Sequence, residues 1–143
     1  MSTERIIVQR SIAEKFRAGI KEAMNEMYHE STTSPVLVNT SQVEKNKRLV
    51  VDAVSQGAKI LVGDVEREEP CAAGMRPVIL EAVTPGMDIY NTESFGPTVS
   101  LYVVDTEDEA IRLANDTDYG LTASVYTENL GRGLRVAKQL EAG

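Results

Sequence analysis

Short blocks of apolar residues, separated by polar stretches, predict strands along the whole chain. A nearly continuous apolar run at 5–9 has the composition of a buried strand. Shorter apolar runs at 59–62 and 77–80 predict two further strands. Apolar and polar residues alternate at 98–103, which is the period of a strand, and a β-rich stretch at 121–127 predicts one more.

Between these strands, apolar residues recur every three or four positions and predict helices. The pairs Ser11–Glu14, Ser41–Glu44 and Thr106–Glu109 are capping boxes, in which a hydroxyl and a carboxylate satisfy free amides of a first helical turn. Pro35 should follow the end of the first helix, and Gly57 suits the residue just after the second. The stripes expected to face the core are Ile12, Phe16, Ile20, Ala23 and Met27, then Val43, Val50 and Val54, and finally Leu130, Leu134, Ala137 and Glu141.

The order β-α-α-β-β-β-α-β-α predicts the fold class. Strands separated by helices favour an α/β layered domain with a mainly parallel sheet flanked by helices. An acidic stretch with proline at 64–70 predicts a solvated loop, and Thr84–Gly86 predicts a turn. No repeat or linker divides the chain, so residues 1–143 form one domain.

Composition excludes several classes of function. Acidic residues outnumber basic ones by 22 to 15 in a chain of 143 residues, and the net charge of −7 disfavours broad binding to nucleic acid. No apolar run approaches the roughly 20 residues that cross a bilayer, and the first residues do not resemble a secretory signal. We therefore expect a cytoplasmic domain that binds neither nucleic acid nor a membrane.

The usual catalytic residues are scarce. Cys71 is the only cysteine and His29 the only histidine, so neither an internal disulfide nor a thiolate-rich metal cage is available. The acidic residues beside Cys71 disfavour the thiolate that a nucleophile needs, which predicts an inert loop cysteine. His29 falls at the expected end of the first helix, where it would cap the helix or lie in solvent. Gly131 and Gly133 lie within a helical stripe and form no phosphate-binding loop.

The segment 91–97 has a composition that suits a ligand. It joins a turn to a strand and places the carboxylate of Glu93, the ring of Phe95 and a Gly-Pro bend within a few residues. A carboxylate at the mouth of a sheet can accept hydrogen bonds from ribose hydroxyls, and a phenyl ring offers an apolar face to a planar ligand. The alternative is a polar turn anchored by a buried phenylalanine. The residues alone leave both interpretations open.

The same segment carries a family resemblance. Glu93–Pro97 resembles the E-x-F-G-P motif of the NAD(P)-dependent aldehyde dehydrogenase superfamily. Other segments follow the pattern of this family in the same order: Gly57–Gly63, Pro77–Leu80, Met87–Ile89, Ala110, Ala114–Asn115, Tyr119–Thr127 and Leu140–Gly143. The resemblance therefore covers nearly the whole chain.

The resemblance implies that residues 1–143 are part of a catalytic domain, without the cofactor-binding domain and the oligomerisation arm. In this family a stretch like Met1–Val8 follows the nucleophilic cysteine directly, so the nucleophile would precede Met1 and this chain would hold no catalytic residue. By matching position, Glu93 would bind the nicotinamide ribose and Phe95 would pack near the nicotinamide. Cys71 falls in a variable loop and does not match the nucleophile.

The expected function is that of a fragment of an aldehyde dehydrogenase, which oxidises an aldehyde to a carboxylic acid through a cysteine thioester. The full-length enzyme would bind NAD or NADP, whereas this chain alone is expected to be inactive and to bind neither. Apolar edges left open should favour a homo-oligomer. Two alternatives remain: a non-enzymatic dehydrogenase-like interaction module, and an unrelated small-molecule-binding α/β domain.

Overall fold

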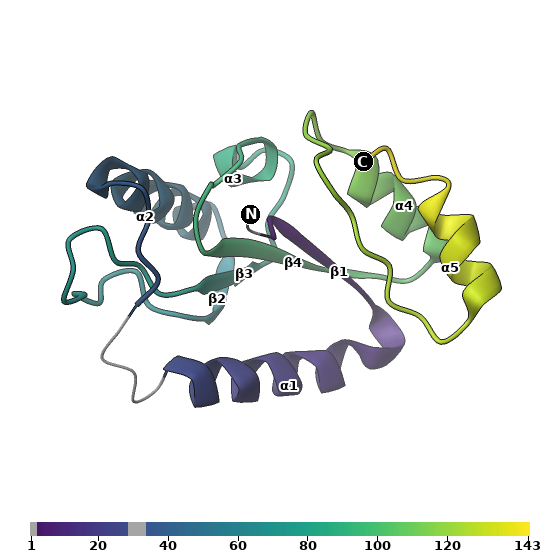
Figure 1. Cartoon of the computed structure of the whole chain (residues 1–143), viewed down its shortest axis with the longest axis horizontal. Coiled ribbons are helices and arrows are strands. Elements are labelled where there is room, and N and C mark those ends of the chain that lie inside the picture. The colour runs from purple at the N-terminus through teal and green to yellow at the C-terminus, as the bar shows by residue number, and fades with distance from the viewer. Residues whose placement is uncertain (1–2, 29–33) are drawn as a thin grey trace.

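The computed structural model describes residues 3–28 and 34–143, which form an α/β/α arrangement around one sheet (Figure 1). His29 lies outside the described residues. In chain order the elements are β1 (Arg5–Gln9), α1 (Arg10–Tyr28), α2 (Thr40–Ser55), β2 (Lys59–Val62), β3 (Val78–Glu81), α3 (Asp88–Asn91), β4 (Thr98–Val104), α4 (Glu107–Asn115) and α5 (Leu130–Ala137).

The four strands form one mixed, mostly parallel sheet in the order β1-β4-β3-β2. The central strand β4 pairs in parallel with both β1 and β3, whereas β2 runs antiparallel to β3. The sequence therefore predicted the fold class and these four strands correctly. The first strand is less buried than expected, because β1 is an edge strand in which only Val8 is buried.

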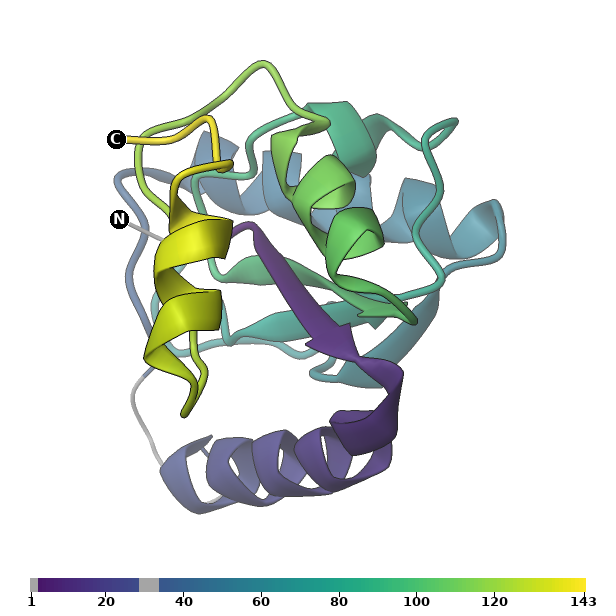
Figure 2. The same cartoon turned by 90° about the vertical axis from the view of Figure 1, so that its right-hand side faces the viewer.

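Helices cover both faces of the sheet (Figures 1 and 2). On one face, α1 packs its partly buried Phe16, Ile20 and Met24 against Ile79 and Leu101 of the sheet. On the other face lies the larger apolar cluster, to which α2 and α3 contribute. Its buried members are Val43, Leu49, Val50, Ala53, Ala58, Val65, Met75, Val78, Leu80, Val83, Met87, Ile89 and Tyr90.

The first helix differs from its prediction at its start and along its stripe. It begins at Arg10, directly after β1, so Ser11 lies inside the first turn and does not cap it. The continuous path of the chain from strand to helix leaves no separate capping residue. Its buried residue is Ala13, whereas Ile12, Ala23 and Met27 are exposed. The face that α1 turns toward the sheet is therefore rotated by about one residue from the predicted stripe.

The capping of α2 also differs from the prediction. Its N-cap is Asn39, whose side chain accepts a hydrogen bond from the Gln42 amide, and Ser41 donates its hydroxyl to Asn39. Val43 and Val50 are buried as expected, but Val54 is 41% exposed. Gly57 follows the helix with a φ of +108°, as predicted.

The start of α4 and the loops before β3 and β4 agree only in part with the prediction. Thr106 caps α4 and accepts from the Glu109 amide, which confirms the hydroxyl half of the third capping box, whereas the Glu109 carboxylate accepts from the Asp105 amide before the cap. The predicted loop at 64–70 forms and is exposed over most of its length, but it buries Val65. Glu69 pairs with Arg76 at 3.0 Å, and both side chains are largely buried. The short helix α3, which follows the predicted turn at 84–86, was not predicted.

The C-terminal part of the chain contains the largest error of the prediction. Residues 121–127 form no strand, because no described strand lies beside them to complete a ladder. The last helix forms at α5, but none of its residues is buried, and Leu130 and Leu134 are 76% and 56% exposed. In Figure 1, α5 lies at the side of the domain opposite α2 and covers neither face of the sheet.

Candidate functional site

The segment 92–97 lies between α3 and β4, at the end of the sheet where β1 and β4 begin. Because β1 and β4 are parallel neighbours, the residue that precedes β1 meets the segment that precedes β4. The Ser100 amide donates to the Glu4 carbonyl at 2.9 Å, which starts this ladder. We call residues 93–97 the motif loop.

The Glu4 carboxylate holds the motif loop from the side of β1. It accepts hydrogen bonds from the Ser94 amide at 3.1 Å, from the Ser94 hydroxyl at 3.1 Å and from the Phe95 amide at 3.3 Å. Ser94 is completely buried, and its hydroxyl oxygen also accepts from the Gly96 amide at 3.2 Å. An ionised acceptor makes stronger hydrogen bonds than a neutral one, so this carboxylate fixes two successive amides of the loop.

Helix α2 holds the motif loop from the other side. The Lys45 ammonium donates to the Glu93 carbonyl at 2.7 Å, and the Asn46 amide group donates to the Ser94 carbonyl at 2.9 Å. A Cβ added at Gly96 would lie 2.4 Å from the Asn46 side chain, so only glycine allows the loop to approach α2 this closely. The loop is therefore fixed by contacts to two separate elements.

Phe95 lies outside the core. Its side chain is 69% exposed, and its backbone has a φ of +49°, in the left-handed region that a bulky residue seldom adopts. The interpretation of the segment as a turn anchored by a buried phenylalanine is therefore wrong, because the buried residue is Ser94. The fold holds an aromatic ring outward at a conformational cost of about 1–3 kcal/mol.

Glu93, two residues before Phe95 in the motif loop, is half-buried. Its carbonyl is bound by Lys45, but within residues 3–28 and 34–143 nothing hydrogen-bonds its carboxylate. An available carboxylate can accept from hydroxyl groups, and an outward phenyl ring can contact a planar ring. The acceptor and apolar groups of the motif loop thus have the chemistry to bind the ribose and the ring of a nicotinamide nucleotide.

The other candidate residues do not join this loop. Cys71 is an exposed free cysteine in a loop, and its backbone carbonyl accepts a hydrogen bond from the Gly74 amide. Among the described residues, no group of three or more His, Cys, Asp or Glu side chains could hold a metal ion. The same residues form no helix that is long and apolar enough to span a membrane.

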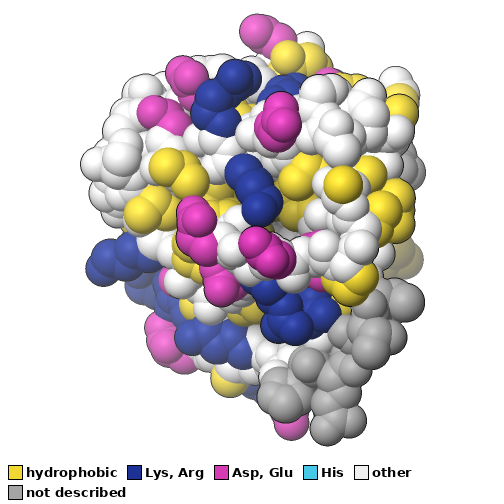
Figure 3. All heavy atoms as spheres, turned by 90° about the vertical axis from the view of Figure 1, so that its left-hand side faces the viewer, with side chains coloured by type: hydrophobic (Ala, Val, Ile, Leu, Met, Phe, Trp, Pro, Cys, Tyr) yellow, Lys and Arg dark blue, Asp and Glu magenta, His cyan; other side chains and the backbone are white. Residues whose placement is uncertain are grey.

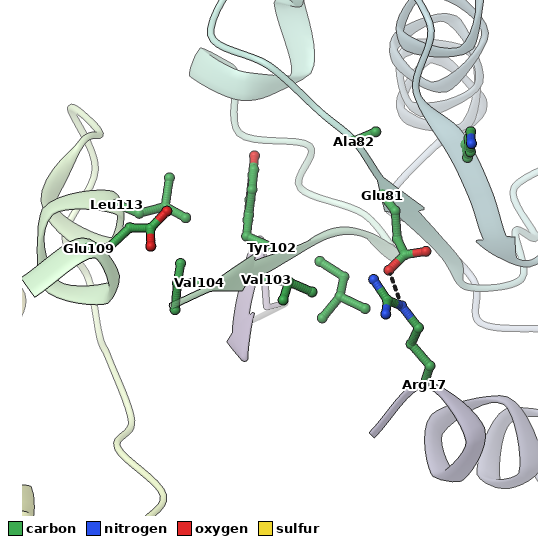
Figure 4. A pocket seen from close by; sticks show the side chains of 10 residues that line it. Arg17, Glu81, Ala82, Tyr102, Val103, Val104, Glu109 and Leu113 are labelled. Carbon is green, nitrogen blue, oxygen red and sulfur yellow. Dashed lines mark hydrogen bonds and ion pairs between the residues drawn. The ribbon is translucent and has the colours of Figure 1, made fainter. Parts of the chain in front are cut away.

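A shallow pocket of about 420 Å³ lies where β3 and β4 end (Figure 4). Arg17 and Glu81 form an ion pair at 2.6 Å along one side, and Glu109 and Leu113 of α4 line the other. Tyr102 stands between them (Figure 4), and Lys59 also lines the pocket. The pocket lies at the opposite end of β4 from the motif loop, and we assign it no role in the candidate site.

Charges are mixed over the face of the molecule seen in Figure 3. Basic and acidic side chains alternate there, with apolar side chains between them, and no continuous basic band is visible.

The residues that clamp the motif loop were not predicted from the sequence. Asn46 could have been noticed, since it is a polar residue on the same helical face as Val43 and Val50 and is completely buried. Nothing in the sequence distinguished Glu4 or Lys45 from other charged residues. Their roles depend on contacts with residues far along the chain.

Comparison with known proteins identifies the class to which the chain belongs. The model of the aldehyde dehydrogenase family matches residues 1–143, so the chain belongs to this family. A putative succinate-semialdehyde dehydrogenase [NADP(+)] of Mycobacterium tuberculosis is 37% identical over 148 aligned positions, which cover 100% of this chain and 29% of that relative.

Solved structures agree with this result. The succinic semialdehyde dehydrogenase of Streptococcus pyogenes, solved with NADP+, superposes with a TM-score of 0.85 at 25% identity and covers 98% of this chain. The salicylaldehyde dehydrogenase of Pseudomonas putida G7, solved with salicylaldehyde, superposes with a TM-score of 0.82 at 32% identity, again over 98% of this chain. The chain spans only 32% and 29% of these two proteins.

Proposed function

We propose that this chain supplies the nicotinamide-side loop of a longer NAD(P)-dependent aldehyde dehydrogenase. The observation that supports this proposal best is the motif loop. There a completely buried Ser94 and contacts from two separate elements fix the loop that carries the exposed Phe95 and the available carboxylate of Glu93. The family match over residues 1–143 and the cofactor in the Streptococcus pyogenes relative support the same assignment.

In this proposal the chain helps to bind and orient the cofactor as part of the longer enzyme, and it leaves the bond-breaking steps to other residues. Glu93 accepts a hydrogen bond from a ribose hydroxyl, and Phe95 contacts the nicotinamide through its exposed ring. A bound nicotinamide would supply the hydride-accepting chemistry of an aldehyde oxidation. The cysteine that attacks the aldehyde directly precedes Met1 in the longer protein, so the present chain alone is inactive. Its substrate is an aldehyde, and its cofactor is NAD or NADP.

The encoding sequence and a reduction assay test this proposal together. A cysteine codon is expected directly before the codon for Met1. The longer protein should reduce NAD(P)+ in the presence of an aldehyde, whereas the 143-residue chain should not. Turnover by the chain alone, or another residue at the preceding position, would contradict the assignment.

A substitution then tests the motif loop in the longer protein. Glu93→Gln should lower kcat/KM by about 10- to 100-fold, because it removes a charged hydrogen-bond acceptor from the ribose. Glu26→Gln is the matched control, since Glu26 is exposed on α1 and forms no hydrogen bond or ion pair with the other described residues. Equal losses for the two variants would count against a cofactor role of Glu93.

A second candidate function is a dehydrogenase-like interaction module that works without catalysis. The exposed apolar residues Leu130 and Leu134 of α5 favour it, because they would suit a protein interface. An in-frame stop codon upstream of Met1, together with expression at this length, would support this alternative. We also propose that the chain forms homo-oligomers, while its cytoplasmic location stays a prediction from the sequence.

A further inference from the structure

We propose that Glu4 is a positioning residue that sets the motif loop for cofactor binding, an inference that rests on the proposed function. The proposal begins from an unusual convergence of donors. Two successive backbone amides and one hydroxyl, all from Ser94 and Phe95, point at the single carboxylate of Glu4. Successive amides that point to one side form an anion-binding concavity, and here a side chain of the same protein occupies it.

The geometry of the Ser94 hydroxyl shows that the carboxylate is its preferred partner. Its single proton could reach Glu4 at 3.1 Å, the Gly96 carbonyl at 3.3 Å or the Thr98 carbonyl at 3.4 Å. The shortest of the three distances is to the only charged acceptor, and a charged acceptor binds the proton most strongly. The Glu4 contact therefore decides the orientation of a completely buried side chain at the centre of the loop.

The hydrogen bond to Glu4 also affects the backbone conformation of Phe95. Its amide donates to Glu4, and its backbone is held at a φ of +49°, which a phenylalanine does not adopt without support. Relaxation of this residue to an ordinary backbone conformation would redirect the ring. The Glu4 contact opposes this relaxation from the side of β1, whereas Lys45 and Asn46 hold only the carbonyl groups of Glu93 and Ser94.

The position of Glu4 in the chain gives this clamp its functional meaning. Glu4 directly precedes β1, so it belongs to the same short segment as Met1, before which we propose the nucleophilic cysteine. One side chain therefore links the segment that carries the nucleophile to the loop that carries Glu93 and Phe95. Glu4 itself contacts neither cofactor nor substrate in this arrangement, and it acts through the loop.

Amide hydrogen exchange in the 143-residue chain tests the clamp without any cofactor. Glu4→Ala should speed exchange at the Ser94 and Phe95 amides by about tenfold or more, because each loses a charged acceptor. The Ser100 amide should stay protected, since its acceptor is the Glu4 backbone carbonyl. Glu4→Gln keeps a side-chain oxygen and should restore part of the protection. Glu26→Ala is the control for loss of one negative charge.

Exchange at Ser94 and Phe95 that does not change in Glu4→Ala would overturn the proposal. Faster exchange along the whole of β1 and β4 would also overturn it, because Glu4 would then support the sheet in general. Both outcomes are independent of catalysis, so failure of this inference is distinguishable from failure of the proposed function.

Kinetics of the longer enzyme test whether the clamp matters for cofactor binding. Glu4→Ala should raise KM for NAD(P)+ and the Kd of the cofactor by about tenfold, with partial rescue by Glu4→Gln. The KM for the aldehyde should change much less, because the substitution is directed at the loop. Wild-type KM and Kd for the cofactor in Glu4→Ala would overturn the positioning role.

Discussion

The motif loop and the C-terminal segment 119–137 differ in what surrounds them. The loop is fixed by Glu4 on one side and by Lys45 and Asn46 on the other. The C-terminal segment is attached by polar contacts, chiefly the pair of hydrogen bonds at 2.8 Å between Arg135 and Glu107. Most of its apolar side chains remain exposed, among them Leu121, Leu130 and Leu134. The period of a helix therefore specifies which side chains share a face, but it does not specify what covers that face.

The largest expected effect is on the free energy of unfolding, and it is seen when a leucine of the core and a leucine of α5 are replaced in turn. Leu80→Ala should lower the free energy of unfolding by about 2–5 kcal/mol, because Leu80 is completely buried and the substitution leaves a cavity. Leu130→Ala should change it by less than about 0.5 kcal/mol, since that side chain is already 76% exposed. Urea denaturation measures both, and equal losses would show that α5 is packed in solution.

The next effect tests how tightly the motif loop approaches α2. Gly96→Ala should cost about 1–3 kcal/mol, because the new methyl group would overlap with the side chain of Asn46. Gly86→Ala is the matched control, since a Cβ there meets no atom within 4 Å. Thermal denaturation compares the two. A Gly96→Ala protein as stable as Gly86→Ala would indicate a loosely held loop.

The exposed face of α5 should cause self-association. Sedimentation velocity is expected to show dimers or larger species, and replacing both Leu130 and Leu134 with serine should weaken the association by about tenfold or more. Lys138→Ser, at an exposed polar position just after the same helix, should leave it unchanged. A wild-type chain that stays monomeric at high concentration would contradict this prediction.

The smallest effect concerns pH. The hydrogen bond from Arg135, and then the charges of Arg135 and Arg132, lower the pKa of Glu107 below its ordinary value of 4.5. The folded state therefore gains stability from this carboxylate above pH 4.5, and this gain is lost as the pH falls through the lowered pKa. NMR spectra of α5 should change in that range in the wild type and not in Glu107→Gln.

The local features of the fold could be predicted from the sequence, whereas features that depend on distant residues could not. Thr106 caps α4 as predicted, because its partner, the Glu109 amide, lies within one turn. Residues 121–127 have the composition of a strand, but a strand also needs a neighbour to pair with, and composition does not supply one. The same limit explains the stripe of α5, whose periodicity is correct and whose burial is not.

The candidate site shows the same division. The motif loop was recognised from its own five residues; in the structure Phe95 is exposed and Glu93 is half-buried, and their roles as cofactor-binding residues stay a prediction. Glu4 was not recognised, because it lies 90 residues from Ser94 in the chain and no spacing rule connects the two. Asn46 lies within a helical stripe, where a buried polar residue could have suggested a partner, but the partner itself could not be named.

The parallel pairing of β1 with β4 also has a consequence for folding. β1 is the first strand of the chain, yet its partner lies in the last third, and the ion pair between Arg10 and Asp105 that follows the two strands spans 95 residues. Closing so long a loop is entropically unfavourable and slows folding. During synthesis, β1 has no strand to pair with in this sheet until β4 has been made, whereas β2 and β3 can pair earlier. The Glu4 contacts to Ser94 and Phe95 can therefore form only after residues 3–95 have been made, whereas the contacts from α2 do not depend on β1.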